Sequence, residues 1–374
     1  MTRVLAVIGS LRVGGAEVYL TRTAPRLRER GVEIEICALD ASGPLLTELQ
    51  AAGIPVHGTG FLRVDPSAKI RSYLKVAAEI RDLVRRGRFD AVHTYLFWSD
   101  VLGGTGARWA GLRRVIMSRR SLHAARRSYR RGYRSLETAT NLLAAEVIAN
   151  SRAVLKDAER SERMLPRRRT VIYNGVDVAG YELARPGARS WLQLVSVGRL
   201  AAHKGHDDAL RALAELARAG VDARLTFVGD GPRRAEMQQL ATALGVESQV
   251  EFAGERDPRP ALQQADLFIL PSHHEGFSNA LLEAMASGLP VVATDAGGTA
   301  EALGDAGGGR LVQPRAPAAL AQALIDLARD RDALAEMGLA NRHRVEANFT
   351  LDRSCDALAA WYRDPQTSLD SGIA

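Results

Sequence analysis

The chain has 374 residues, of which 25% are charged and 46% hydrophobic; this is ordinary for a soluble globular enzyme, and the length favours two domains that each bury a sheet. Residues 1–185 carry a net charge of +14 and residues 186–374 a net charge of −7, so the first half is expected to meet anionic partners. The sequence excludes a membrane-spanning helix, because no apolar run approaches about 20 residues, and the spacing of its two cysteines excludes a structural metal site and favours the cytoplasm.

Short apolar runs alternate with helical patterns along the first half of the chain. Such alternation predicts right-handed crossovers and a parallel sheet. We expect a helix from the GGAE loop at 14–17 to about residue 30, and others at 45–51, 67–86 and 99–109. Strands are expected at 3–8, 33–39, 91–95, 115–117, 146–149 and 170–173.

A strongly basic segment surrounds the fourth of these strands. Arg113 to Arg134 contains nine arginines and no acidic residue. A solvated surface is one interpretation; the other is a basic surface for anionic lipid headgroups or a phosphorylated acceptor. Nucleic acid is not expected as a partner, because the segment has no recognisable nucleic-acid module and few aromatic residues for base stacking.

The second half starts a new series of strands and helices after a linker at about 183–189. We therefore predict one domain at 1–184 and another at 185–350, with a C-terminal helix at about 351–364 that packs back on the first. The sequence is helical from Ala316 onward. Strands are expected at 192–197, 225–228, 250–252, 267–270, 291–293 and 310–312.

The stretch 265–287 carries the strongest functional signal. Its pattern predicts a buried parallel strand at Leu267 to Leu270, a polar bend and an amphipathic helix. Open α/β sheets bind ligands at the carboxyl ends of their strands, where this chain has Glu275 and, eight residues later, Glu283. Eight residues are about 2.2 helical turns, so the two carboxylates are expected on nearly the same face. Carboxylates can accept hydrogen bonds from hydroxyl groups, and the free N–H groups at the start of a helix favour phosphate. A nucleotide sugar carries both kinds of group.

Two cations follow another strand end. Arg199 and Lys204 lie where a phosphate would bind and can neutralise a diphosphate, although a pair of surface cations is the alternative. Gly229 and Gly231 form only part of a dinucleotide fingerprint and by themselves indicate a turn. His273 and His274 are adjacent on the bend after Leu270 and therefore point in different directions. No third ligand is evident beside them, so no metal site is expected there.

The order of these motifs resembles that of the retaining glycosyltransferases with two facing Rossmann-like domains and a cleft between them, the GT-B fold, and in particular family 4. The resemblance covers nearly the whole chain, and its spaced glutamates are its most specific feature. It rests on GGAE at 14–17, NGVD at 174–177, GRLAAHKG at 198–205, FVGDGP at 227–232 and EGFSNALLEAMASGLPVVATDAGG at 275–298.

The resemblance implies a role for each matched position. Glu275 would hold hydroxyls of the donor sugar and Glu283 the ribose hydroxyls. The backbone of Gly276, Phe277 and Ser278 would cradle the sugar and diphosphate. No divalent metal or other cofactor would then be needed.

The remaining matched positions concern the diphosphate and the loops around it. Arg199 and Lys204 would stabilise the departing diphosphate, and the Gly14-Gly15 loop would close over the sugar and phosphate. Donor binding is also implied for Asn174, Gly229 and Gly231. Transfer would proceed by front-face attack with retention, and a covalent role for Glu275 is the alternative.

One position departs from the family pattern. Many relatives carry a histidine after the strand that ends here at Met117, whereas this chain offers Arg120 and, three residues further on, His123. Either Arg120 takes over the role and holds a phosphate or an acceptor anion, or His123 reaches the site.

The sequence therefore predicts a cytoplasmic, metal-independent glycosyltransferase. It would move a hexose or N-acetylhexosamine from a UDP-sugar to a lipid-linked or cell-surface glycan acceptor, in polysaccharide, lipopolysaccharide or capsule biosynthesis. The segment Arg113 to Arg134 would contact the anionic inner face of the plasma membrane. Two alternatives are a sugar-nucleotide epimerase of the same fold and a non-enzymatic protein that binds polyanions or RNA.

Overall fold

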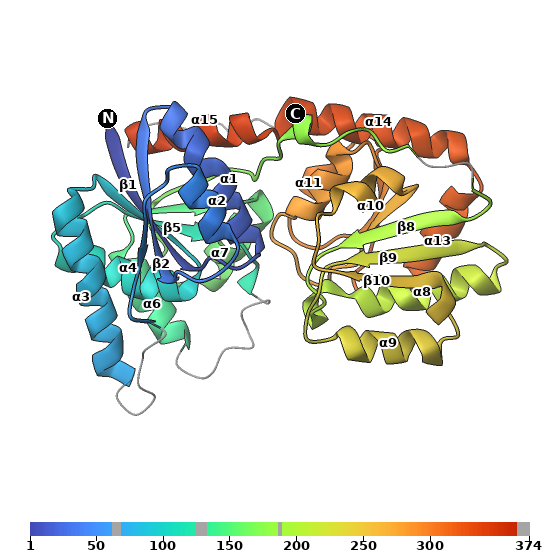
Figure 1. Cartoon of the computed structure of the whole chain (residues 1–374), viewed down its shortest axis with the longest axis horizontal. Helices are drawn as coiled ribbons and strands as arrows, with labels where there is room; N and C mark the ends of the chain where they lie inside the picture. Colours follow the sequence, from blue (N-terminus) through green and yellow to red (C-terminus); the bar gives the residue numbers. More distant parts are fainter. Residues whose placement is uncertain (62–68, 124–132, 186–188, 365–374) are drawn as a thin grey trace. The chain divides into compact units, whose positions relative to one another are not determined.

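The computed structural model describes residues 1–61, 69–123, 133–185 and 189–364 (Figure 1). The chain divides into two compact units. The first comprises Met1–Asn174 and the C-terminal segment that begins at Leu351, and the second comprises Gly175–Thr350. The sequence-based boundary at 184 and 185 lies ten residues beyond this change of unit.

The first unit contains a seven-stranded parallel sheet in the order β3-β2-β1-β4-β5-β6-β7. The central strands are nearly continuous apolar runs, as expected for strands covered on both faces. The strands are β1 (Thr2–Ser10), β2 (Val32–Asp40), β3 (Val56–Gly58), β4 (Ala91–Tyr95), β5 (Val115–Arg119), β6 (Glu146–Ala149) and β7 (Arg168–Val171).

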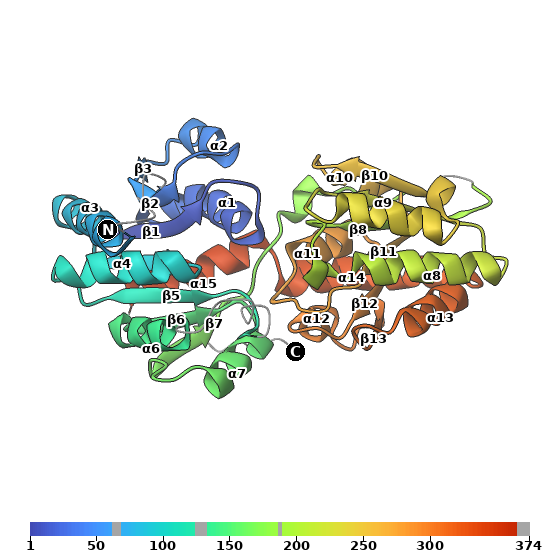
Figure 2. The ribbon, with the colours of Figure 1, turned by 90° about the horizontal axis from the view of Figure 1, so that it is seen from below.

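Helices cover both faces of this sheet. Along β1, Val4 and Ile8 belong to one hydrophobic cluster and Leu5 and Val7 to another, which is the two-residue period of a strand buried on both sides. On one face α1 packs against α2 and α15; on the other α4 packs against α3 and α6 (Figure 2). The helices are α1 (Gly15–Glu29), α2 (Leu45–Ala51), α3 (Lys69–Gly87), α4 (Phe97–Trp109), α6 (Tyr133–Leu143), α7 (Arg152–Ser161) and α15 (Leu351–Arg363).

The second unit contains a six-stranded parallel sheet in the order β10-β9-β8-β11-β12-β13. Its strands are β8 (Leu192–Val197), β9 (Ala223–Val228), β10 (Val250–Gly254), β11 (Leu267–Leu270), β12 (Val291–Thr294) and β13 (Gly309–Val312).

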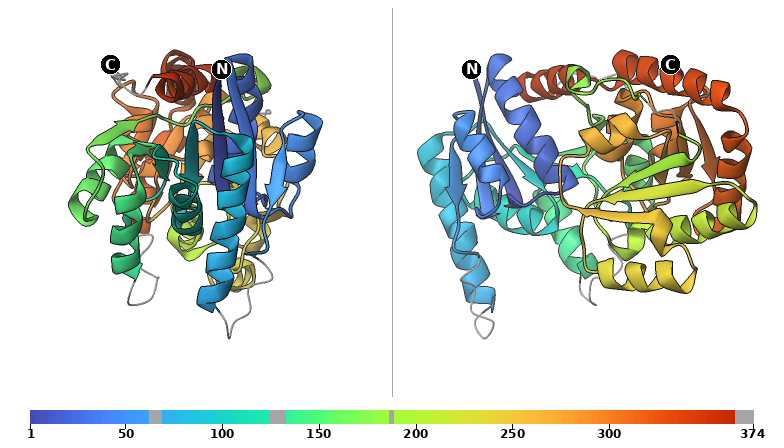
Figure 3. Two further views of the ribbon diagram at one scale, coloured as in Figure 1. Left: turned by 90° about the vertical axis from the view of Figure 1, so that its left-hand side faces the viewer. Right: turned by 45° about the vertical axis from the view of Figure 1, so that its right-hand side comes forward.

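Two groups of helices enclose the second sheet. Helix α8 packs with α9 and α13, and α11 packs with α12 and α14; in the right-hand view of Figure 3 the strands run between these groups. The helices are α8 (His206–Arg218), α9 (Arg234–Ala243), α10 (Arg259–Gln264), α11 (Asn279–Ala286), α12 (Thr299–Leu303), α13 (Pro317–Ala328) and α14 (Arg331–Asn348). Single turns of 3-10 helix lie at Val178–Gly180, Ala202–Lys204 and Glu247–Gln249.

All strand pairs in both sheets are parallel. The carboxyl ends of the strands in each sheet therefore share one edge. The loops that follow β1, β5 and β7 meet at this edge of the first unit, and those that follow β8, β9, β11 and β12 meet at this edge of the second. In each unit, the fold therefore brings that unit's predicted functional positions to the same edge of its sheet.

Candidate functional site

In the second unit, a lysine and a glutamate that are 71 residues apart form a direct ion pair. Lys204 Nζ lies 2.7 Å from Glu275 Oε2, and the Ser272 hydroxyl donates to the same oxygen at 3.1 Å. The two charged side chains are mostly buried, with exposed fractions of 19% and 13%. The ends of β8 and β11, which are neighbours in the sheet, bring the pair together.

The surroundings of Glu275 keep its carboxylate ionised. Burial raises the pKa of Glu275, but the charge and hydrogen bond of Lys204 and the Ser272 hydroxyl outweigh burial, so the pKa falls below its ordinary value. His203 lies in the same field, and its pKa is lowered by burial and by the charge of Lys204. The site therefore combines an anion and a cation with a histidine that is mostly neutral near pH 7.

Close backbone contacts fix the loop that carries Glu275. Gly297 has φ +60°, and a Cβ there would lie 1.8 Å from the Glu275 carbonyl oxygen. Gly205 has φ +63°, and its Cβ would lie 2.0 Å from the Pro271 oxygen. His273 also donates its amide to the His203 carbonyl. Only glycine fits at Gly205 and Gly297, and the three loops therefore form one rigid layer.

The glycines after β9 approach the loop after β8. A Cβ on Gly229 would lie 2.2 Å from the Gly198 oxygen, and one on Gly231 would lie 2.4 Å from the Leu200 oxygen. Between them, Arg199 is exposed. Within the described residues its side chain has no hydrogen bond or ion pair, so its charge is available to a ligand.

Helix α11 begins directly behind this loop. Ser278 is its N-cap and accepts a hydrogen bond from the Leu281 amide, while Phe277 is buried with its ring 5.3 Å from that of Phe349. Glu283 lies in the helix and is 6% exposed. The expectation that Glu275 and Glu283 share a helix face is wrong, because the helix begins at Asn279 and the four preceding residues form the loop.

In the first unit, Arg120 follows β5 and is enclosed by aromatic rings. Its guanidinium lies 4.2 Å from the ring centre of Tyr19 and 6.0 Å from that of Tyr95. Arg120 also donates to the side-chain oxygen of Asn174 at 2.7 Å. Burial lowers the pKa of Arg120. The structure thus brings two predicted site residues, Arg120 and Asn174, into contact. The Arg120 guanidinium is held by two aromatic rings and by the Asn174 side-chain amide.

The GGAE loop lies near this arginine. Gly14 is the N-cap of α1, and a Cβ there would lie 2.4 Å from the Glu17 carboxylate. Burial raises the pKa of Glu17, although its own backbone amide and the charge of Arg120 act in the opposite direction. Gly15, the first helical residue, has open space around its Cα. The loop therefore places one carboxyl group in the electrostatic field of Arg120.

His123 belongs to a different set of contacts. Its backbone amide donates to the Asp157 carboxylate, and its Nδ1 lies 3.9 Å from Glu137 Oε2. These contacts direct it toward α6 and α7. Of the two candidates for the family's histidine role, Arg120 is the one that contacts Asn174.

The expectation that Arg113 to Arg134 forms an unopposed basic surface is wrong for three of its arginines. Arg114 pairs with Glu146 at 2.9 Å, Arg119 is buried, and Arg120 is stacked as described above. The acids that pair with Arg114 and Arg119 come from elsewhere in the chain, so the sequence segment alone could not reveal them. Residues 124–132 lie outside the described residues, as do the side chains at 133 and 134.

Sequence analysis missed the buried ion network around Arg119, the residue before Arg120. Arg119 lies 2.9 Å from Asp100 and 3.0 Å from Glu162, and it donates to Asn141 at 2.6 Å. The network ties β5 to α4, α6 and the end of α7. A signal was present, because an arginine inside an otherwise apolar strand needs a buried acid.

Sequence analysis also missed a polar cluster around His93 in β4. The two ring nitrogens of His93 bond to the hydroxyls of Tyr362 and Ser118. Burial lowers the pKa of His93 to about 3, so the ring is neutral. The cluster links α15 to the sheet beneath Arg120.

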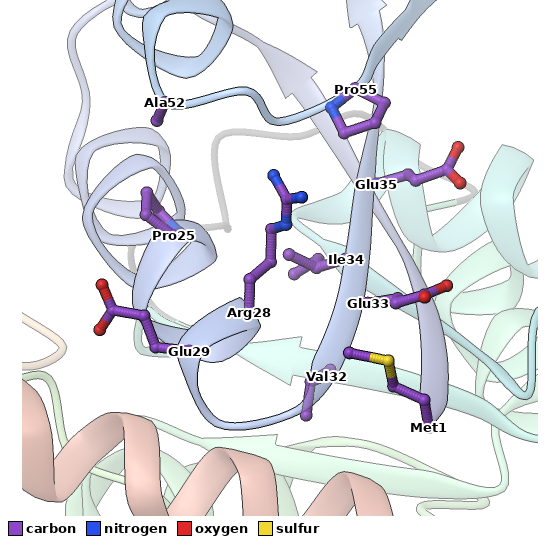
Figure 4. Close-up of a pocket in the computed structure, with 10 residues that line it drawn as sticks. All are labelled: Met1, Pro25, Arg28, Glu29, Val32, Glu33, Ile34, Glu35, Ala52 and Pro55. Atoms are coloured by element: carbon purple, nitrogen blue, oxygen red, sulfur yellow. The ribbon is translucent and has the colours of Figure 1, made fainter.

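A pocket of about 490 Å³ lies elsewhere, at the amino ends of β1 and β2 (Figure 4). Arg28 projects into its middle, and Glu33 and Glu35 line it. Both acids pair with Arg3. None of the predicted site residues lines this pocket, which lies at the opposite edge of the sheet from Arg120.

The described residues contain neither a membrane-spanning helix nor a candidate metal cluster. No helix there is long and apolar enough to cross a membrane. In the same residues, no group of three or more His, Cys, Asp and Glu side chains could hold a metal ion.

Models of known families match both halves of the chain. Residues 13–179 match "Glycosyltransferase Family 4", and residues 192–330 match "Glycosyl transferases group 1". A D-inositol 3-phosphate glycosyltransferase of Nocardia farcinica is 31% identical over 90% of this chain and 82% of its own length.

Solved structures resemble this chain over nearly its whole length. Anabaena Alr3699/HepE in complex with UDP and glucose is 23% identical and covers 97% of this chain and 100% of that one, with a TM-score of 0.84. Sucrose-phosphate synthase from Thermosynechococcus elongatus is 18% identical and covers 97% and 98%, with a TM-score of 0.81. These matches show the GT-B fold.

Proposed function

Because this chain belongs to glycosyltransferase family 4, we propose that it moves a hexose or an N-acetylhexosamine from a UDP-sugar to a lipid-linked or cell-surface glycan acceptor. The observation that carries the donor part is the ion pair of Lys204 and Glu275 at the carboxyl edge of the second sheet. It supplies a cation for a diphosphate and a carboxylate for hydroxyl groups within one contact.

The donor would use groups that are already positioned. Lys204 and the exposed Arg199 would neutralise the diphosphate, and the amides at Gly276 and the start of α11 would add hydrogen-bond donors. Glu275 would accept from sugar hydroxyls and Glu283 from the ribose. The Alr3699/HepE neighbour was solved with UDP and glucose, which supports a nucleotide-sugar donor of this kind.

We propose that transfer retains the anomeric configuration and needs no metal. The bond between the anomeric carbon and the diphosphate oxygen would break while the acceptor oxygen bonds to the same face. The acceptor proton would pass to the departing phosphate. Lys204 and Arg199 would stabilise the charge on that leaving group. Glu275 fits a binding role better than a nucleophilic one, because Lys204 and Ser272 already hold its Oε2.

The surroundings of Arg120 support the proposal that the acceptor carries an anionic group. Its charge is held by rings and an amide rather than by a bonded carboxylate among the described residues, and the first 185 residues carry a net charge of +14. The name of the Nocardia relative indicates a phosphate-bearing acceptor. A lipid-linked sugar phosphate on the cytoplasmic side of the membrane would also present an anionic phosphate group. The free thiols of Cys37 and Cys355 fit the reducing cytoplasm.

A thermal-shift panel of nucleoside diphosphates and their sugars, with and without EDTA, tests the donor site. We expect UDP and a UDP-sugar at 100 times their dissociation constants to stabilise the protein by about 2.7 kcal/mol, with no effect of EDTA. Glu283→Ala should weaken the shift. If no nucleotide shifts the melting temperature, the donor proposal fails. Conversion of the UDP-sugar without acceptor and without release of UDP would instead indicate an epimerase.

A further inference from the structure

Helix α6 exposes an unusually apolar face. The exposed positions between Ser135 and Leu143 are Ser135, Leu136, Ala139 and Leu142, and none is charged. Leu142 is 58% exposed. A solvent-facing helix surface normally carries charged or polar residues, so this face is built for contact with something other than water.

Met164 adds a second apolar group under backbone strain. It has φ +59°, a left-handed conformation that is an outlier for a bulky residue. Its side chain is 60% exposed, so packing does not explain the strain. The neighbouring Leu165 packs into the core with Leu143, while Met164 points outward. Such strain at an exposed apolar residue indicates a functional constraint.

One side chain ties the two apolar features together. The Asn141 amide donates to the Arg163 carbonyl at 2.9 Å and to Glu162 at 3.1 Å. Leu142 and Met164 directly follow Asn141 and Arg163 in the chain, so the bond between Asn141 and Arg163 brings their two segments close together. The end of α6 and the segment after α7 therefore lie side by side (Figure 2).

Exposed cations precede Met164 along the chain. Lys156, Arg160 and Arg163 are exposed on α7 and just after it, and none of the three has an ion pair in the part of the chain that the structure describes. The exposed acid on α7, Glu159, is occupied by Arg169 at 2.6 Å. The surface thus joins apolar side chains to unbalanced positive charge.

We propose that Leu136, Leu142 and Met164, together with Lys156, Arg160 and Arg163, form a docking surface for an anionic lipid bilayer. The apolar residues would enter the boundary of the acyl chains and the cations would contact phosphate headgroups. This α6–α7 surface differs from the segment 113–134 singled out in the sequence. The proposal rests on the proposed function and deepens it, because this surface would bring the enzyme to a lipid-linked acceptor. Binding of the protein to a membrane can nevertheless be measured without any acceptor.

The first experiment is co-sedimentation of the full chain with vesicles of equal parts phosphatidylglycerol and phosphatidylcholine. We expect binding at low salt, a strong decrease at raised salt, and none to pure phosphatidylcholine. Replacing Lys156, Arg160 and Arg163 by Gln should lower the partition coefficient about 100-fold. The control replaces Arg211, Arg310 and Arg329 of the second unit by Gln, which lowers the net charge equally and should have little effect.

The second experiment separates the apolar contact from folding. Asn tolerates a positive φ better than Met does, so Met164→Asn should keep or raise the melting temperature while lowering vesicle binding several-fold. Leu339→Asn on α14, where Leu339 is 48% exposed, is the matched control and should leave binding unchanged. The UDP thermal shift should be the same in all these variants.

Three results would overturn the proposal. Equal vesicle binding by wild type and by the triple Gln variant would remove the role of the cations. Unchanged binding in Met164→Asn would remove the role of the apolar tip. A dimer in light scattering that Met164→Asn dissociates would assign the surface to a second copy of the chain. Loss of the UDP shift alone would count against the donor site and leave the membrane surface in place.

Discussion

Replacing Lys204 by Met should have a measurable cost in stability as well as in binding. Its ammonium group lies 2.7 Å from Glu275, and both side chains are mostly buried. Removing one partner of a fully buried pair costs about 3–5 kcal/mol, because the remaining charge is left unpaired. Residual solvent contact reduces this, so we expect a loss of about 2–3 kcal/mol at pH 7. For a unit of this size, that lowers the melting temperature by roughly 5 °C or more.

A second substitution shows whether the stranded carboxylate is the cause. In the Lys204→Met background, Glu275→Gln should recover part of the lost stability, because a neutral amide is cheaper to bury than an unpaired carboxylate. The pH dependence has a defined sign. The pKa of Glu275 is lowered in the folded protein, so the wild-type pair stabilises above the unfolded-state pKa and loses this effect as the pH falls through the folded-state pKa. The penalty of Lys204→Met should therefore shrink in acid.

Binding of UDP tests the function of the same pair. Loss of one charge-assisted contact should reduce affinity by about 1.5–3 kcal/mol, or roughly 10- to 150-fold. Isothermal titration calorimetry on wild type and Lys204→Met measures this difference. Lys156→Met, in the first unit, is the control for removal of a positive charge. If Lys204→Met binds UDP as tightly as this control, or if Glu275→Gln recovers no stability, the pair does not have the role assigned to it.

Three further substitutions test other parts of the two units. Gly297→Ala should destabilise by at least about 2 kcal/mol more than Gly220→Ala in thermal unfolding, because both glycines have positive φ but only Gly297 would clash with a neighbouring backbone. Burial lowers the pKa of His206 to about 3, so the unfolded chain binds a proton that the folded one does not. This should reduce the unfolding free energy by about 2 kcal/mol between pH 7.5 and pH 5, and His206→Gln should remove that part of the slope. Arg120→Gln should lower kcat/KM for transfer at least about tenfold while the melting temperature changes little, since no bonded carboxylate is stranded; a large loss of stability with normal transfer would contradict this.

Much of the fold could be predicted from local patterns. Continuous apolar runs identified the strands that are buried on both faces, and β4, β8 and β11 have the predicted bounds. The short edge strand β3 was missed because Val56–Gly58 has only three residues and no apolar run. Helix α6 was missed although Leu136, Ala139 and Leu142 recur at helical spacing. Ser151 is the N-cap of α7, and its hydroxyl accepts a hydrogen bond from the Val154 amide.

The candidate site was harder to predict because its geometry depends on distant contacts. The motif gave Lys204 and Glu275 as separate residues, but only the order of the strands places their charged atoms in contact. The assumption that the helix extended back to Glu275 failed, because Ser278 caps it. The arginines of the basic segment seemed unopposed because acids such as Glu146 are 32 residues away along the chain.

The two units hold their site cations in different ways, and this has a consequence for ligands. Lys204 is compensated by Glu275, so a diphosphate that bound there would compete with a carboxylate that is already bonded. Arg120 is held against Tyr19 and Asn174, and within the described ranges no carboxylate bonds to its guanidinium. An anion that reaches Arg120 therefore displaces no bonded acid and gains the full charge-assisted contact. Since guanidinium does not titrate near neutral pH, an anionic group recognised by Arg120 would stay bound across the pH range in which a histidine at this position would lose its charge.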